Sequence, residues 1–182
     1  MREIRERRSI RKYKDTPVER KKVEEALRSA SLAPSGNNRQ PWQFIVVSDP
    51  ERRQALTEAC NSQSWMMGAP VFIACIADIR ARAEVPKDLR VDEDSPHWEL
   101  KRVIRDTGVA IGYLMLEATH LGLGTCWIGM YSQKDIRPIL GIPEDMFVLG
   151  IVTLGYADEN PSSRPRKDLS QIVHWERWGG KA

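Results

Sequence analysis

A loop in the first quarter of the chain is rich in amide side chains. The stretch APSGNNRQPWQF runs from Ala33 to Phe44, between a helical pattern and an apolar run. Amides donate and accept hydrogen bonds, so such a loop suits a ligand with polar edges. An ordinary turn, in which Asn and Gly satisfy local backbone groups, is the alternative. The polar or backbone-permissive residues are Ser35, Gly36, Asn37, Asn38, Arg39, Gln40 and Gln43.

Basic residues gather near both ends of the chain. MREIRERRSIRK, Met1 to Lys12, carries six Arg or Lys against two Glu, and SSRPRK, Ser162 to Lys167, adds three more basic residues. Each cluster is either a solvated basic face or part of an anion site. The 28 basic and 25 acidic residues of the whole chain leave a net charge of only +3, which argues against a nucleic-acid partner.

The sequence lacks the usual residue patterns of metal, disulfide and nucleophile chemistry. Three widely spaced cysteines form no C-x-x-C pair, which indicates a reducing compartment, and three scattered histidines have no metal-ligand spacing. GLGTCWIG does not fit G-x-G-x-x-G, and no serine has the G-x-S-x-G context. An enzyme of this composition would need a cofactor to carry its reaction.

The hydropathy pattern predicts a cytoplasmic protein without a membrane partner. The N-terminus is charged from Arg2 onward and has no apolar signal-peptide core. The longest apolar run, Ala69 to Ala77, is far too short to span a bilayer. The length of 182 residues fits a single domain over 1–182.

Local signals predict alternating helices and strands. A capping box at Thr16-Pro17-Val18-Glu19 predicts a helix that ends before Pro34. Residues 79–99 are mostly charged and irregular, which favours a surface excursion or lid over a core segment. The tail 157–182 carries Trp175 and Trp178, so we expect it to dock on this subunit or a partner. The other predicted elements are a strand Trp42–Ser48, a helix opened by Asp49-Pro50, a central strand Pro70–Asp78, a helix from about Leu100 to Leu121 stopped by Gly122 or Gly124, a strand Thr125–Gly129, a helix from Ser132 to Gly141 and a strand Met146–Tyr156.

Four stretches together resemble the signature regions of the nitroreductase family of FMN-dependent oxidoreductases. They are RRSIRKY at Arg7 to Tyr13, APSGNNRQPWQF, GLGTCWIGMY at Gly122 to Tyr131, and SSRPRKDL near the end. They occur in the family's order and cover nearly the whole chain. The resemblance implies an α+β fold with a central, mainly antiparallel sheet of four to five strands flanked by helices. It also implies an intertwined homodimer with FMN at the subunit interface.

The resemblance assigns cofactor contacts to the basic clusters. The first motif supplies Arg7, Arg8, Ser9 and Arg11, with Arg11 at the edge of the flavin ring. Ser9 would lie with Arg7, Arg164 and Arg166 around the phosphate. An FMN phosphate dianion favours charge-assisted hydrogen bonds, and an arginine beside the ring favours the reduced flavin, which accumulates negative charge.

The resemblance also assigns contacts to the loop and to two later segments. The loop would reach the FMN of the other subunit, Asn61 or Gln63 would place an amide at the ring edge, and a segment after Cys126 would lie over one flavin face, with a backbone N–H directed at N5. Ser64 stands where some members have lysine, and Gly129 where some have glutamate. The candidates are Pro34, Ser35, Gly36, Asn37, Asn38, Gln40, Asn61, Gln63, Trp127, Ile128, Gly129 and Met130.

The implied activity is a ping-pong reaction in which NADH or NADPH gives hydride to the flavin and an electron-poor acceptor is then reduced. Nitroaromatics, quinones and flavins are the expected acceptors. A specialised reaction of the same family, such as reductive dehalogenation or flavin fragmentation, is an alternative, with Glu84, Lys87 and Arg90 as candidate lid charges. A non-catalytic flavin-binding module and a nucleic-acid binder come from other classes, and the latter predicts strongly salt-dependent binding.

Overall fold

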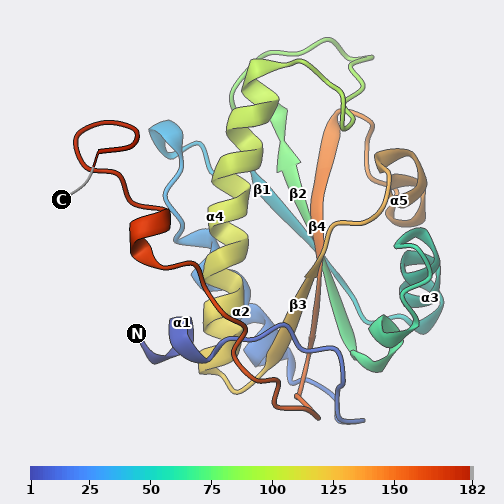
Figure 1. Cartoon of the computed structure of the whole chain (residues 1–182). Coiled ribbons are helices and arrows are strands. Elements are labelled where there is room, and N and C mark those ends of the chain that lie inside the picture. The colour runs from blue at the N-terminus through green and yellow to red at the C-terminus, as the bar shows by residue number, and fades with distance from the viewer. Residues whose placement is uncertain (181–182) are drawn as a thin grey trace.

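A computed structural model of the chain describes residues 1–180 and centres on a four-stranded sheet (Figure 1). The strands are β1 (Trp42–Val47), β2 (Val71–Asp78), β3 (Gly124–Ile128) and β4 (Met146–Gly155). Their order is β1-β2-β4-β3, and all three pairings are antiparallel. The predicted α+β class with a mainly antiparallel sheet is therefore confirmed.

The two inner strands are apolar on both faces. Seven of the eight residues of β2 are buried, and β4 is buried over its second half. A strand covered by helices on both sides reads as a continuous apolar run. The pairing of β2 with β4 contains a β-bulge between Cys75 and Ile76: Cys75 faces Gly150, whereas Ile76 faces Val148.

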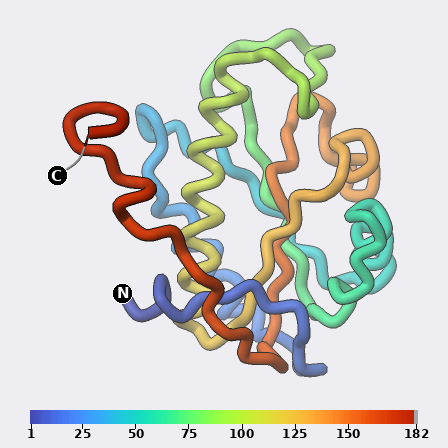
Figure 2. Tube along the Cα trace, in the orientation of Figure 1, coloured from blue at the N-terminus to red at the C-terminus, as the bar shows by residue number. Residues whose placement is uncertain are grey.

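Helices cover both faces of the sheet and form three layers with it (Figures 1 and 2). One core cluster contains residues of α2 (Arg20–Ser31) and α4 (Trp98–His120) with side chains of all the strands but β3. The opposite cluster contains Leu56 of α3 (Pro50–Ala59) and Ile136 of α5 (Gln133–Leu140). A third cluster lies where β2 meets the start of α4.

Several predicted helix ends are confirmed by their caps. The Asp49 carboxylate accepts a hydrogen bond from the Arg52 N–H at 3.0 Å, and Ser132 accepts one from the Asp135 N–H at 3.2 Å. Gly141 ends α5 in the left-handed region with φ of 63°, where a glycine has no steric cost. Gly122, with φ of 77°, follows the end of α4.

The predicted capping box at Thr16 is wrong. Helix α2 begins at Arg20, its N-cap is Glu19, and no side chain caps it. Glu19 instead accepts a hydrogen bond from the Tyr156 hydroxyl at 2.6 Å, which ties the start of α2 to the residue after β4. A long-range hydrogen bond has replaced the local one that the tetrapeptide pattern predicts.

Segment 79–99 is only partly the surface excursion that its charge predicts. Ile79 and Val91 are buried with Leu100 and Val103 in the third core cluster. The Arg137 guanidinium, which is itself buried, donates to the carbonyl of Val91 and to that of Glu144.

The described residues also form four short 3₁₀ turns: η1 (Gly36–Asn38), η2 (Ser64–Gly68), η3 (Ile79–Ala81) and η4 (Leu169–Gln171).

The segment after helix α1 (Arg2–Glu6) and the segment after β4 lie close together at one end of the sheet (Figures 1 and 2). Helix α1, which the sequence patterns did not predict, contacts α4. The Asp158 N–H donates to the Lys12 carbonyl at 2.9 Å, which links the two segments directly. From Ser162 onward the chain is largely exposed, and Trp178 is 90% exposed. Among residues 1–180, no helix combines the length and apolar character needed to cross a bilayer.

The contact of α1 with α4 should depend on pH. His120 Nδ1 lies 3.0 Å from Glu3 Oε1. The hydrogen bond to Glu3 raises the pKa of His120 above 6.5, and hydrogen bonds from its own backbone and from His120 lower the pKa of Glu3 below 4.5. The histidine's contribution is complete below its unfolded pKa and is lost as pH rises. The glutamate's is complete above its unfolded pKa and is lost as pH falls.

We therefore expect α1 to be best protected between about pH 4.5 and 6.5. Amide hydrogen exchange of residues 2–6, corrected for the intrinsic pH dependence of exchange, measures this. His120→Gln should flatten the profile, and an equally pH-dependent profile in that variant would contradict the assignment.

Candidate functional site

The two basic clusters meet in one cavity. A cavity of about 370 Å³ lies between the N-terminal segment and the segment after β4. Both segments supply arginines, so residues more than 150 positions apart in sequence share one solvent-filled space. Such a concentration of guanidinium groups is suited to a phosphate dianion. The cavity is lined by Arg7, Arg8, Ser9, Arg11, Glu159, Pro161, Ser162, Arg164 and Arg166.

Backbone contacts fix the N-terminal segment against the sheet. Ser9 forms a parallel bridge with Thr125 of β3, and the Ile10 N–H donates to the Thr125 carbonyl at 2.9 Å. The Tyr13 hydroxyl donates to the Ile10 carbonyl at 2.7 Å. Ile10 itself is buried. The arginines on either side of Ile10 are therefore presented from an anchored segment.

Glu159 is a site residue that the sequence patterns missed. Its Oε1 accepts hydrogen bonds from the Arg11 N–H at 2.5 Å and the Lys12 N–H at 3.0 Å. Among the described residues that line the cavity, it is the single acidic one. Its carboxylate holds the backbone beside Arg11 and offsets part of the positive charge. Its position three residues before SSRPRK was the only available signal.

The Arg11 guanidinium lies over an aromatic ring. Its Cζ is 5.6 Å from the centroid of the Trp65 ring, within the range of a cation–π contact. Cys126 is close by: burial raises the pKa of its thiol, while Arg11, a hydrogen bond with Ser9 and the charge of Arg7 offset part of that rise. A buried thiol with a raised pKa is a poor nucleophile, so packing accounts for Cys126.

A second group of candidates lines a separate recess. Asn61, Gly129 and Met130 share a recess of about 460 Å³ with Asp135 of α5 and with Ser132, the N-cap of that helix. Asn61 has φ of 57°, a left-handed conformation that asparagine tolerates better than most residues. Gln63 lies outside this recess, and its Nε2 donates to the Cys60 carbonyl at 3.0 Å. The side chain of Ile128 is in the core, so only its backbone could face a ligand.

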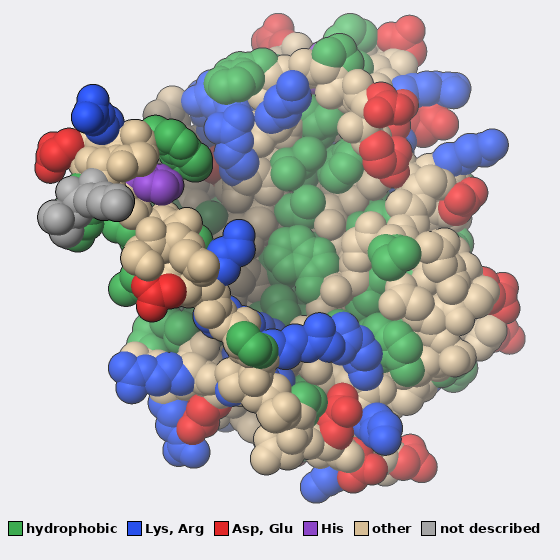
Figure 3. Space-filling model, viewed as in Figure 1, with side chains coloured by type: hydrophobic (Ala, Val, Ile, Leu, Met, Phe, Trp, Pro, Cys, Tyr) green, Lys and Arg blue, Asp and Glu red, His purple; other side chains and the backbone are tan. Residues whose placement is uncertain are grey.

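Trp127 lies against a glycine of the neighbouring strand. A methyl group on Gly150 would collide with Nε1 of the Trp127 indole, so the absence of a side chain there makes room for the ring. The indole is 38% exposed although it lies on the sheet. Figure 3 shows hydrophobic side chains in a hollow at the centre of this face, with Lys and Arg side chains along its lower edge. A flat, partly apolar ligand with a charged end fits such a hollow.

The amide loop is ordered by its own contacts and by α4. The Ser35 hydroxyl accepts a hydrogen bond from the Gln40 N–H at 2.9 Å, and the Gly36 N–H donates to Asp106 of α4 at 3.1 Å. Asn37, Asn38 and Gln40 all have positive φ. In the described part of the chain, residues 1–180, the predicted loop residues do not line the basic cavity, and they do not line the recess that contains Asn61. Within one chain, the loop and the basic cavity are therefore separate.

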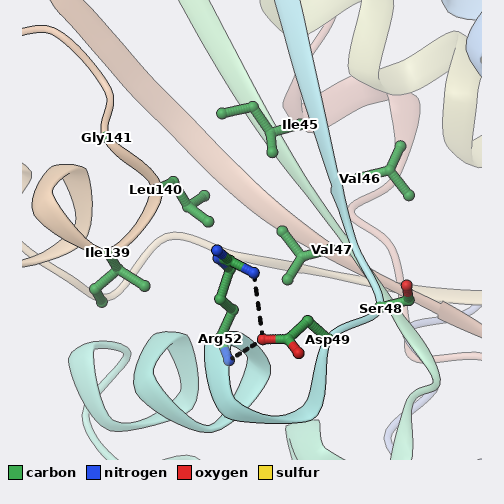
Figure 4. Close-up of a pocket in the computed structure, with 9 residues that line it drawn as sticks. All are labelled: Ile45, Val46, Val47, Ser48, Asp49, Arg52, Ile139, Leu140 and Gly141. Atoms are coloured by element: carbon green, nitrogen blue, oxygen red, sulfur yellow. Dashed lines mark hydrogen bonds and ion pairs between the residues drawn. The ribbon is translucent and has the colours of Figure 1, made fainter.

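A further pocket lies beside the edge strand β1, away from the predicted site residues. It is bounded by the end of β1, the start of α3 and the end of α5 (Figure 4). Its charged pair, Arg52 and Asp49, is engaged in capping α3, with Nη1 of Arg52 3.5 Å from Oδ1 of Asp49. Apolar side chains make up much of the remaining wall, so the pocket offers no acid–base constellation.

Comparison with known proteins defines the family. The chain matches the Nitroreductase family over residues 4–65 and 59–156. It is 33% identical over 178 residues to a protein of Archaeoglobus fulgidus named provisionally NADH dehydrogenase/NAD(P)H nitroreductase, covering 94% of each chain. It is 30% identical to the FMN reductase [NAD(P)H] of Bacillus subtilis, over 94% of this chain and 71% of that protein.

Solved structures agree. The fold matches an FMN-dependent nitroreductase of Clostridium difficile with a TM-score of 0.79 and 31% identity, over 96% of this chain and 98% of that one. The chain belongs to the nitroreductase family. It is accordingly an NAD(P)H-dependent flavin oxidoreductase that uses FMN.

The packing of Trp127 on Gly150 yields a stability prediction. Gly150→Ala should lower the free energy of unfolding by about 1–3 kcal/mol, because the added methyl group forces the indole to move. Gly112→Ala is the control: apart from its own helical turn, a methyl there meets no atom of the described residues within 4 Å, and helix propensity should add about 0.5–1 kcal/mol of stability. Urea unfolding measures both. A Gly150→Ala variant as stable as the parent would show that Trp127 is not held there.

Proposed function

We propose that the basic cavity binds the phosphate of FMN. The observation that carries the proposal is the convergence of five arginines and Ser9 in one space. Arg7, Ser9, Arg164 and Arg166 would surround the phosphate, and Arg8 would add charge. Near the cavity, Arg8 donates from Nη1 to the Arg5 and Arg7 carbonyls at 2.7 and 2.9 Å, so its role is partly to order the segment.

The flavin ring would lie over the hollow beside β3. Arg11 borders both the cavity and Trp65, and this position supports our proposal that its charge lies at the ring edge of such a flavin. Trp127 supplies exposed apolar surface, and Gly129 and Met130 continue from the same strand. Asn61 shares their recess and is the better amide candidate, because Gln63 is engaged by Cys60.

We propose a ping-pong reaction that takes hydride from NAD(P)H and then reduces an electron-poor acceptor such as a nitroaromatic, a quinone or a flavin. Bound FMN would supply the hydride chemistry. Arg11 would stabilise negative charge at the ring edge, and the backbone after Ile128 would offer an N–H near the reacting position. The protein therefore acts by binding, orienting and polarising, which agrees with the lack of a nucleophile motif in the sequence.

A homodimer would complete the site. A groove of about 730 Å³ with exposed apolar side chains, including Ile4, Leu32 and Tyr113, lies between α1, α2 and α4. Trp175 and Trp178 of the tail are also exposed within the chain. Burial of this surface against a second copy would be favourable, and it would let the loop 34–40 of one subunit reach the flavin of the other. We propose one domain over 1–182, with 157–182 as an arm.

A specialised reaction of the same family is the second candidate. Glu84, Lys87 and Arg90 are exposed, as a charged lid over 79–99 would require. Arg90, however, pairs with Glu144 at 2.7 Å, so its charge is directed at the turn before β4. General oxidoreductase chemistry is the better supported proposal.

A cytoplasmic location is favoured because Cys60, Cys75 and Cys126 are all free thiols.

The phosphate assignment predicts selective loss of FMN affinity. Replacing both Arg164 and Arg166 with Gln should weaken FMN binding by tenfold or more, because hydrogen bonds to a charged group contribute roughly 1.5–3 kcal/mol each. Riboflavin, which lacks the phosphate, should bind the variant and the parent equally. Flavin fluorescence titration measures both ligands. Arg20→Gln, at an exposed arginine paired with Glu24, is the matched control. An equal loss for riboflavin would place the phosphate elsewhere.

The Arg11 assignment predicts a change in flavin potential. Arg11→Ala should lower the two-electron reduction potential of bound FMN by tens of millivolts, since about 30 mV corresponds to roughly 1.4 kcal/mol. In Arg11→Lys the reduction potential should stay close to that of the parent, because lysine keeps the positive charge. Equilibration with redox dyes provides the measurement. An unchanged potential in Arg11→Ala would remove Arg11 from the ring edge.

A further inference from the structure

One arginine of segment 79–99 lies beneath the amide loop. The Arg82 side chain is only 5% exposed. Its Nη1 donates to the Gly36 carbonyl at 2.9 Å, and its Nε donates to Glu99 Oε2 at 3.0 Å. A buried guanidinium with an acid on one side and a backbone carbonyl on the other is a fixed contact, unlike a solvated surface charge.

Asp106 holds the same glycine from the other side. Its Oδ2 accepts the Gly36 N–H at 3.1 Å and lies 3.5 Å from Nη1 of Arg82. Both backbone polar groups of Gly36 are thus engaged by one ion pair. Glu99 also pairs with Arg102 at 3.0 Å. Desolvation alone would raise the pKa of Glu99, but the hydrogen bonds from Arg82 and Arg102 outweigh it and lower the pKa, so the Glu99 carboxylate stays charged at neutral pH.

The conformation of the loop 34–40 requires stabilising contacts from outside the loop. Asn37, Asn38 and Gln40 have φ of 55°, 54° and 48°. A left-handed backbone is disfavoured for residues other than glycine, least so for asparagine and more so for Gln40. Three such residues in one short loop persist only when their surroundings determine them. Ser35 fixes the far end through Gln40, while Arg82 and Asp106 fix Gly36.

The size of Gly36 is matched to the guanidinium. A Cβ at this position would lie 2.6 Å from Nη1 and 3.1 Å from Nη2 of Arg82. Any larger residue at position 36 would therefore displace the arginine. Segment 79–99 is anchored a second time further along, because Val91 packs in the third core cluster and its carbonyl accepts a hydrogen bond from Arg137.

We propose that Arg82 and Asp106 are positioning residues that hold the loop 34–40 in its flavin-binding conformation. The inference rests on the proposed function, in which this loop contacts the flavin. It gives segment 79–99 a role that its charge pattern alone did not indicate: through Arg82 the segment sets the affinity of the cofactor site without touching the cofactor.

The test compares two arginines of one turn in the full chain. Arg82→Met removes the clamp, whereas Arg80→Met removes an arginine that pairs with Asp78 and Asp145 instead of the loop. Arg82→Met should raise the Kd for FMN about tenfold, and Arg80→Met should leave it within about twofold. The inhibition constant of inorganic phosphate as a competitor of FMN should be the same in Arg82→Met as in the parent, because phosphate alone would occupy the arginine cavity. Arg82→Lys should recover part of the affinity.

A double-mutant cycle separates positioning from general destabilisation. Gly36→Ala should weaken FMN binding about as much as Arg82→Met, and the double variant should be no weaker than either, because the methyl group collides with the arginine alone. Independent losses that multiply to about a hundredfold would overturn the clamp. If Arg82→Met does not fold, the cycle is run with Arg82→Lys.

The two proposals fail in different ways. FMN binding by the parent and by Arg80→Met, with no loss in Arg82→Met or Gly36→Ala, would overturn the positioning role and leave the proposed function intact. No FMN binding by the parent would overturn the proposed function, and the positioning role would fall with it.

Discussion

The convergence of positive charge from the two ends of the chain is the constraint on which the rest of the account depends. Within residues 1–180, five arginines line one cavity with a single carboxylate, that of Glu159. Such a concentration of like charge is unfavourable unless an anion relieves it, and a phosphate dianion with several acceptor oxygens does so well. The backbone anchors at Thr125 and Lys12 give both segments a fixed place beside β3.

The three layers place a flat hollow next to that charge. The sheet is buried by α2 and α4 on one face and by α3 and α5 on the other. Strand β3 is an edge strand of the sheet, and the N-terminal segment bridges its outer side at Thr125. Trp127 remains partly exposed there because Gly150 leaves room for its ring. The charged and flat parts of one ligand can therefore bind within one region.

Much of this could be predicted from the sequence because its signals are local. The apolar run of β2 and the caps at Asp49, Ser132 and Gly141 depend on neighbouring residues, and each was confirmed. The start of α2 was not predicted, because a distant hydroxyl, that of Tyr156, determines how Glu19 is used. The burial of Ile79 and Val91 also depends on tertiary packing that a charged sequence conceals.

The candidate site likewise contains residues that the sequence motifs predicted and residues that they did not. The motifs located the arginines of the cavity, but Glu159 and Arg82 act through backbone groups of distant residues and carry no local signature. The amide loop was recognised by composition, yet its conformation depends on Asp106, 70 positions away. Long-range contacts to the backbone are the part of the site that single-sequence patterns do not record.

The most direct measurement is the visible absorption spectrum of the purified protein reconstituted with FMN, recorded before and after anaerobic addition of NADH or NADPH. We expect the chain to retain the flavin, and we expect at least one nucleotide to bleach the long-wavelength band of that flavin. Failure to retain FMN would contradict the cavity assignment. Retained flavin that neither nucleotide bleaches would contradict the proposed reaction.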